Sequence, residues 1–194
     1  MAWAKNGTTT LGSAGDDLDV TTDSSVKFNM FMAHELTTGN VRAELNFNSD
    51  TGSNYARRTS NNGGADFTIG SDNDIKLTDN PVNTAFQIAY IINIATEEKL
   101  MIQFNSQATT AGAGAAPSRY ETVAKWANTS NLITDFQIQN SSTGDFDTSS
   151  NLSALGSDLT PAAAIPATIS DGAIFYETDT NKAYVLYNGS WTEL

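Results

Sequence analysis

Residues 41–48, VRAELNFN, carry the clearest fold signal in the chain. Val41, Ala43, Leu45 and Phe47 alternate with polar residues, so their side chains lie on one face of an extended chain. Such alternation is typical of a β-strand with one face against a core. The pattern recurs in residues 26–34, 86–94, 100–104, 120–126 and 132–138.

The segments between these runs are rich in Gly, Asn, Asp and Ser, which favour turns. Gly39 and Asn40 predict a hairpin between residues 26–34 and 41–48. Ile91 adds an apolar residue to the second side of 86–94, which indicates a strand covered on both faces. Shorter strand candidates are residues 55–59, 67–69 and 75–77. Without any βα alternation, the chain is expected to be all-β, an antiparallel β-sandwich or jelly roll.

Residues 157–170, SDLTPAAAIPATIS, hold two of the four prolines and are typical of an extended linker. The linker separates residues 1–156, a predicted sandwich with an N-terminal arm, from residues 171–194, a predicted small C-terminal β-hairpin. A hairpin of this size buries too little surface to be stable alone. We therefore expect it to dock on its own domain, on a neighbouring subunit or on another protein.

The charge balance argues against direct nucleic-acid binding. Lys and Arg number 10 against 22 Asp and Glu, a net charge of −12, whereas contacts with phosphates need clustered basic residues. The chain has no cysteine, which excludes disulfides, thiolate zinc sites and cysteine nucleophiles. The apolar run 88–92 is too short to span a bilayer, and the N-terminus lacks an apolar segment of secretory length. We expect no membrane segment and synthesis in a cytoplasm.

No catalytic, cofactor or metal residue is predicted. The single histidine, His34, has no GxSxG serine to activate and cannot form a histidine metal cluster. Asp72 and Asp74 begin an EF-hand-like run that lacks the required glycine and glutamate, so turn formation is the favoured role. Calcium held between loops or subunits stays open as an alternative. A glycosidase carboxylate pair ranks last, since nothing indicates which acids meet.

Four aromatic residues are candidates for an interface. Trp3 and Trp191 lie at the two chain ends, outside the main strand series, and tryptophan is enriched among interface anchors. Tyr176 and Tyr187 belong to the C-terminal hairpin that needs a partner. For the tryptophans, capping of their own domain and contact with another subunit are both open.

Three segments resemble virion proteins of tailed bacteriophages. In residues 46–58, NFNSDTGSNYARR, a strand end is followed by TGSNY and a second strand, with Ser49 where the family pattern has glycine. Residues 126–156 are similar to the family's closing pair of strands, although NLSALG lacks the usual aromatic residue. Residues 172–191, GAIFYETDTNKAYVLYNGSW, resemble a hairpin that recurs on phage head and tail proteins. The resemblance implies a β-sandwich virion component and no catalytic residues.

On this basis we expect a non-enzymatic structural virion protein that decorates the capsid through contacts with copies of itself and with other virion proteins. A shell-forming protein is expected to be larger and to have a basic inner face. The alternative is a carbohydrate-binding, receptor-binding module of a tail fibre or cell surface, with Tyr55 or Tyr120 against a host-surface glycan. The expected location is the virion, after synthesis in the host cytoplasm without a signal peptide.

Overall fold

The computed structural model describes residues 3–78, 84–108, 110–157, 170–178 and 180–194. The chain divides into two compact units, Met1–Leu159 and Thr160–Leu194. Every regular element among the described residues is a β-strand, so the described part contains no helix that could cross a membrane. The predicted all-β fold is confirmed.

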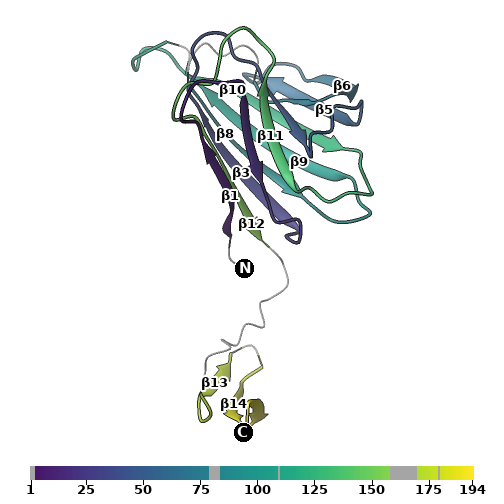
Figure 1. Ribbon diagram of the computed structural model, residues 1–194, viewed down its shortest axis with the longest axis vertical. Helices are drawn as coiled ribbons and strands as arrows, with labels where there is room; N and C mark the ends of the chain where they lie inside the picture. Colours follow the sequence, from purple (N-terminus) through teal and green to yellow (C-terminus); the bar gives the residue numbers. More distant parts are fainter. Residues whose placement is uncertain (1–2, 79–83, 109, 158–169, 179) are drawn as a thin grey trace. The chain divides into compact units, whose positions relative to one another are not determined.

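The first unit is a sandwich of two antiparallel sheets (Figure 1). The strand order is β1-β12-β3-β8-β9-β10-β5-β6 in the large sheet and β2-β11-β4-β7 in the small sheet. The strands of the large sheet are β1 (Ala4–Thr10), β12 (Asn151–Ser157), β3 (Phe28–Glu35), β8 (Ala85–Ile92), β9 (Lys99–Gln107), β10 (Ser118–Trp126), β5 (Tyr55–Asn61) and β6 (Phe67–Asp72). Those of the small sheet are β2 (Asp17–Thr21), β11 (Asp135–Asn140), β4 (Ala43–Phe47) and β7 (Ile75–Lys76).

The core lies between the two sheets. The alternate residues Val41, Ala43, Leu45 and Phe47 are all fully buried there, as their spacing predicts. The ring centroid of Phe47 lies 5.7 Å from that of Trp126, which comes from the large sheet. Aromatic side chains of the two sheets thus interlock across the sandwich and fix its spacing.

Asp50 organises the loop that carries the chain from β4 to β5, and so from one sheet to the other. Its carboxylate accepts hydrogen bonds from Trp126 Nε1 at 2.7 Å, from the Gly52 amide at 2.9 Å and from Asn54 Nδ2 at 2.9 Å. Burial opposes ionisation of Asp50, but these three hydrogen bonds lower its pKa below the ordinary value. Residues 46–58 comprise the end of β4, this loop and the first part of β5.

The predicted hairpin at Gly39 and Asn40 is wrong. β3 pairs with β12 and β8 in the large sheet, whereas β4 pairs with β11 and β7 in the small sheet. The link between β3 and β4 therefore crosses the sandwich instead of turning within one sheet. Each strand presents one buried face, and the two faces meet across the core, where packing replaces hydrogen bonding.

The predicted N-terminal arm contains two strands, β1 and β2. β1 pairs antiparallel with β12 at the edge of the large sheet, with a bulge between Lys5 and Gly7. Its sequence, AKNGTTT, is polar on both sides because an edge strand here buries little, so it gives no alternation to detect. β2 buries only Leu18 and Val20, a pattern too short to stand out.

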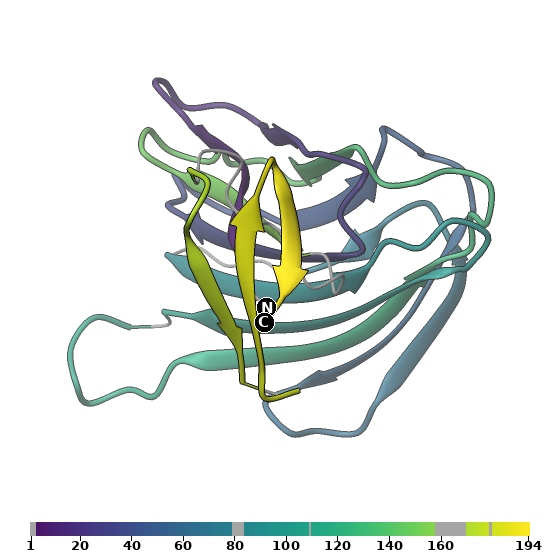
Figure 2. The ribbon, with the colours of Figure 1, turned by 90° about the horizontal axis from the view of Figure 1, so that it is seen from below.

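The C-terminal unit is a three-stranded antiparallel sheet, seen with its strands side by side in Figure 2. Its strands are β13 (Ile174–Glu177), β14 (Lys182–Tyr187) and β15 (Ser190–Glu193). The predicted hairpin is present and gains the third strand through a tight turn, in which Asn188 and Gly189 have φ values of 48° and 71°. Much of the predicted linker, residues 158–169, lies outside the described residues.

Candidate functional site

The outer face of the large sheet exposes a group of large apolar side chains across β8, β9 and β10. The six are about half exposed, whereas the next residues along each strand point into the sandwich. We call them the apolar patch: Phe86 (50%), Tyr90 (45%), Leu100 (52%), Ile102 (51%), Phe104 (49%) and Val123 (50%). Patches of this kind on a soluble protein mark interaction surfaces.

Ile102 occupies the middle of the apolar patch. In the strand register it lies opposite Tyr90 of β8 on one side and Val123 of β10 on the other. Three shallow grooves flank it, with volumes of about 480, 310 and 180 Å³, and Ile102 lines all of them. The surface is therefore a ridge bordered by hollows.

The inward positions of β8 and β9 carry amide side chains among small or apolar ones such as Ala89 and Met101. Gln87 and Gln103 are fully buried, and Asn105 and Gln107 are nearly so. In β8 and β9 this arrangement inverts the expected one, in which the larger apolar set of an alternating strand faces the core. The expectation that 86–94 is covered on both faces is wrong, since Phe86 and Tyr90 are exposed. Alternation identifies a strand but does not state which set lies inside.

Glu35, at the end of β3, joins this inner polar row. Gln87 Nε2 donates to Glu35 Oε1, and Gln103 Nε2 donates to Gln87 Oε1 at 3.3 Å. The Glu35 carboxyl is completely buried, and burial raises its pKa to about 8, although the hydrogen bond from Gln87 acts in the opposite direction. The side chain is therefore protonated at neutral pH, inside the sandwich and out of reach of solvent.

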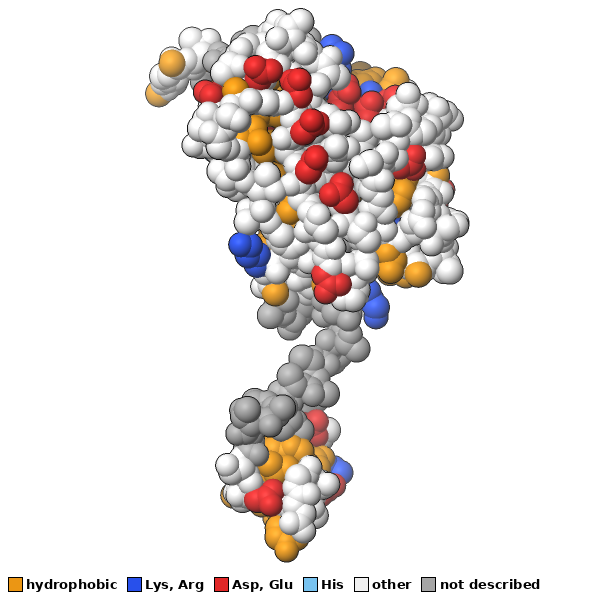
Figure 3. Space-filling model, in the orientation of Figure 1, with side chains coloured by type: hydrophobic (Ala, Val, Ile, Leu, Met, Phe, Trp, Pro, Cys, Tyr) orange, Lys and Arg blue, Asp and Glu red, His pale blue; other side chains and the backbone are white. Residues whose placement is uncertain are grey.

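Charges are distributed unevenly over the two outer faces of the sandwich. Around the apolar patch they form ion pairs within the chain: Lys125 with Glu98 at 2.8 Å, Arg58 with Asp66 at 3.6 Å and Arg119 with Glu121 at 3.8 Å. The small sheet instead presents acidic side chains, including Asp17, Asp19 and Asp135. Figure 3 shows acidic side chains aligned on the face that this sheet forms.

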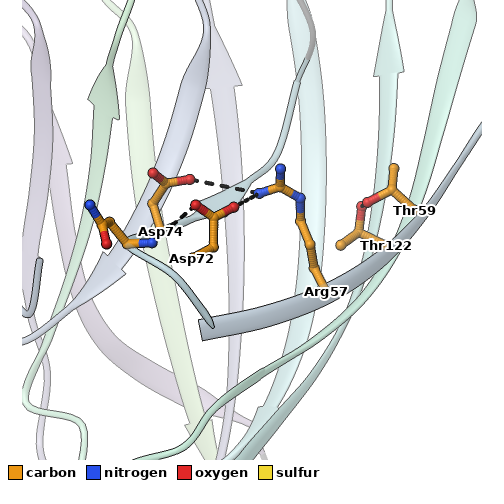
Figure 4. Close-up of polar contacts among 6 residues, drawn as sticks. Arg57, Thr59, Asp72, Asp74 and Thr122 are labelled. Atoms are coloured by element: carbon orange, nitrogen blue, oxygen red, sulfur yellow. Dashed lines mark hydrogen bonds and ion pairs between the residues drawn. The ribbon is translucent and has the colours of Figure 1, made fainter. Parts of the chain in front are cut away.

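The acidic run 72–74 forms a structural ion pair. Arg57 Nη1 lies 2.8 Å from Asp72 Oδ2 and 3.8 Å from Asp74 Oδ1 (Figure 4). Burial, together with the charges of Glu44 and Asp72, raises the pKa of Asp74 to about 6. Within the described ranges, no group of three or more His, Asp or Glu side chains is placed to hold a metal ion. The ion pairs of Arg57 join β5 to the end of β6 and to the β6–β7 link.

The structure places Trp3 beside the apolar patch. Trp3 is 41% exposed, its ring centroid lies 6.4 Å from that of Tyr90, and both residues line the 310 Å³ groove. Trp3, the interface candidate in the first unit, thus lies at an exposed apolar surface. His34 is exposed at the end of β3.

The other three candidates lie in the C-terminal unit, on different faces of its sheet. Tyr176 and Tyr187 are 55% and 67% exposed, and the strand register and alternation put them on one face. Trp191 lies on the opposite face, where its ring centroid is 6.1 Å from that of Phe175. Trp191 therefore packs against Phe175 on that face of the sheet.

Sequence reasoning assigned the residues of the apolar patch to strands but did not propose them as a site. A usable signal was present in β9, where Leu100, Ile102 and Phe104 alternate with Gln103 and Asn105. A strand with amides on one side and large apolar residues on the other fits two orientations equally. Only the pairing partners decide between them.

No known protein family matches the sequence, and no curated protein matches it significantly. The fold and the apolar patch together define an all-β sandwich protein with an exposed apolar sheet face.

Proposed function

We propose that the chain is a non-enzymatic structural protein of a tailed virus, which decorates the capsid through subunit contacts. The observation that carries this proposal is the apolar patch, since six large side chains held half exposed on a rigid sheet are costly in water unless another surface covers them. The sequence resemblance to phage virion proteins supports the viral setting.

The strongly perturbed acid of the sandwich also supports a structural role. Glu35 has the raised pKa that catalytic acids often show, but it is completely buried and bonded to Gln87. A substrate at the surface cannot contact it. The Arg57 ion pair and the Asp50 loop likewise use their charges to join strands.

The C-terminal unit serves in this proposal as the attachment element, with another virion protein as its partner. Ile174, Tyr176 and Tyr187 are 71%, 55% and 67% exposed on one face of its sheet. The opposite face holds the cluster of Phe175, Tyr184 and Trp191. A three-stranded sheet of this size that is apolar on both faces is stabilised by docking.

The test is recovery of the protein with intact particles of the virus that encodes it. Full-length protein is expected to sediment with purified particles, and Tyr187→Asp is expected to release it. Thr21→Asp, a change at an exposed position of the small sheet, serves as the control and is expected to stay bound. If intact particles lack the protein, the proposal is wrong.

A second candidate is a carbohydrate-binding module. The exposed ring pair of Trp3 and Tyr90 beside a shallow groove favours it, because aromatic faces stack on sugars. Tyr55 and Tyr120, the residues suggested by the sequence, are 1% and 4% exposed and cannot contact a glycan. Binding to a glycan array that disappears in Tyr90→Ala would favour this candidate over capsid decoration.

A further inference from the structure

We propose that the apolar patch is the interface of a homodimer, in which the large sheets of two copies pack face to face around a two-fold axis close to Ile102. The inference rests on the proposed function for its biological setting and adds the partner that covers the patch, a second copy of the chain.

The exposed area of the patch matches what a dimer needs. A large apolar side chain that is half exposed offers about 100 Å² for burial, so the six residues offer about 600 Å² in each copy. Two copies would bury about 1,200 Å² in total, which reaches the range of stable protein interfaces. Half-buried neighbours in the same strands, such as Ile88 and Ile92, extend the contact.

The charge pattern permits contact between two acidic molecules. A net charge of −12 on each copy opposes association. The charges that border the patch, however, are neutralised within the chain by the pairs Lys125–Glu98, Arg58–Asp66 and Arg119–Glu121. The acidic small sheet lies on the other side of the sandwich, so face-to-face packing of the large sheets keeps the two acidic surfaces far apart.

The shape of the apolar patch allows it to pack against the same patch of a second copy. Ile102 and its cross-strand neighbours Tyr90 and Val123 form the ridge, and the 480 and 310 Å³ grooves both border Ile102. A two-fold axis near Ile102 places the Ile102 side chains of the two copies against each other. The outer parts of each ridge, at Tyr90 and Val123, then face the grooves of the other copy, because an isologous interface must present both partners of each contact on one surface. Packing of this kind has the geometry of a β-sandwich interior.

The experiment measures the mass of full-length protein by sedimentation equilibrium over a range of concentrations. Wild type is expected to dimerise, and Ile102→Asp, which places a charge in the middle of the interface, is expected to raise the dissociation constant by about 100-fold or more. Since Ile102 is already half exposed, the variant should fold, and an unchanged near-ultraviolet circular dichroism spectrum checks this. Thr21→Asp, which adds the same charge to the small sheet, is expected to dimerise like wild type.

A charge-swap mixture makes the test specific for a second copy. Ile102→Asp and Ile102→Lys are each expected to be monomeric, and their equimolar mixture is expected to recover the dimer, because the two residues meet near the axis. Wild type that stays monomeric, or Ile102→Asp that dimerises normally, overturns the inference. A monomeric wild type that still sediments with particles overturns the dimer alone, whereas a dimer absent from particles overturns the proposed function alone.

Discussion

Glu35→Gln is expected to remove most of the dependence of stability on pH between pH 5 and pH 9. Glu35 is fully buried, and its pKa is raised from 4.5 to about 8 by that burial. Between these two values the folded chain keeps a proton that the unfolded chain has lost. The contribution of Glu35 to the free energy of unfolding is therefore fully present below pH 4.5 and is lost as the pH rises toward 8.

The pKa values set the size of the effect. At about 1.4 kcal/mol for each pKa unit, a rise from 4.5 to about 8 corresponds to a loss of as much as about 5 kcal/mol across the window. Glutamine has nearly the same shape and stays neutral, and its carbonyl oxygen can still accept the hydrogen bond from Gln87. The variant is thus expected to lose little stability at pH 5 and to exceed wild type at pH 9.

The assay is urea unfolding followed by tryptophan fluorescence at pH 5, 6, 7, 8 and 9. The exposed residue Glu97 supplies the matched control, Glu97→Gln, whose curve is expected to parallel that of wild type. Titration of the side-chain carboxyl of Glu35 by nuclear magnetic resonance gives the folded-state pKa directly. Parallel pH curves for wild type and Glu35→Gln would refute the reasoning, because burial of a neutral Glu35 would then not be the cause.

Three further changes test the frame of the sandwich. Asp50→Ala leaves Trp126 Nε1 without its acceptor and is expected to lower the free energy of unfolding by about 2–3 kcal/mol in urea titrations at pH 7. An unchanged midpoint of urea unfolding would show that Asp50 does not stabilise the loop. Gly7→Ala places a methyl group on a residue with φ of 136° and against the carbonyl oxygen of Thr21. The change is expected to lower the free energy of unfolding by about 1–3 kcal/mol, measured by thermal unfolding. A variant as stable as wild type would contradict this backbone strain. Asp74→Asn removes an acid whose pKa in the folded chain is about 6 instead of 3.8. The free energy of unfolding is therefore expected to fall less between pH 4 and pH 6 in the variant than in wild type. The same dependence on pH in both proteins would show that Asp74 ionises normally.

The sequence is sufficient to predict the strands whose buried face is purely apolar. Residues 41–48 are the clearest example, since Val41, Ala43, Leu45 and Phe47 all reach the core. The same reasoning finds β8 and β9 as strands but misplaces their apolar sets, because the sandwich interior there accepts Gln87 and Gln103 in hydrogen bonds. Burial of an amide depends on a partner from a distant strand, which no local pattern contains.

The candidate site is predictable only in part for the same reason. The place of Trp3 near the chain end and the small size of the C-terminal unit, which holds Tyr176 and Tyr187, make these residues interface candidates from the sequence. The pairing of β3 with β8, which places β8 and β9 in the middle of the large sheet, joins segments far apart in the chain. The predicted hairpin at Gly39 fails likewise, since turn residues do not reveal whether the next strand pairs with the last one or crosses to the other sheet.

The hydrogen-bonded row of Glu35, Gln87 and Gln103 also favours one register of the central strands. A shift of β8 or β9 by one residue would exchange its two faces, sending Tyr90 or Ile102 inward and the amides out to water. The shift would also bring Ile91 and Met101, which the native alignment buries, out to water. The native alignment gives Gln87 a bond to both Glu35 and Gln103. Polar contacts inside the sandwich thus help to hold the alignment that leaves the apolar patch on the outer side of the sheet.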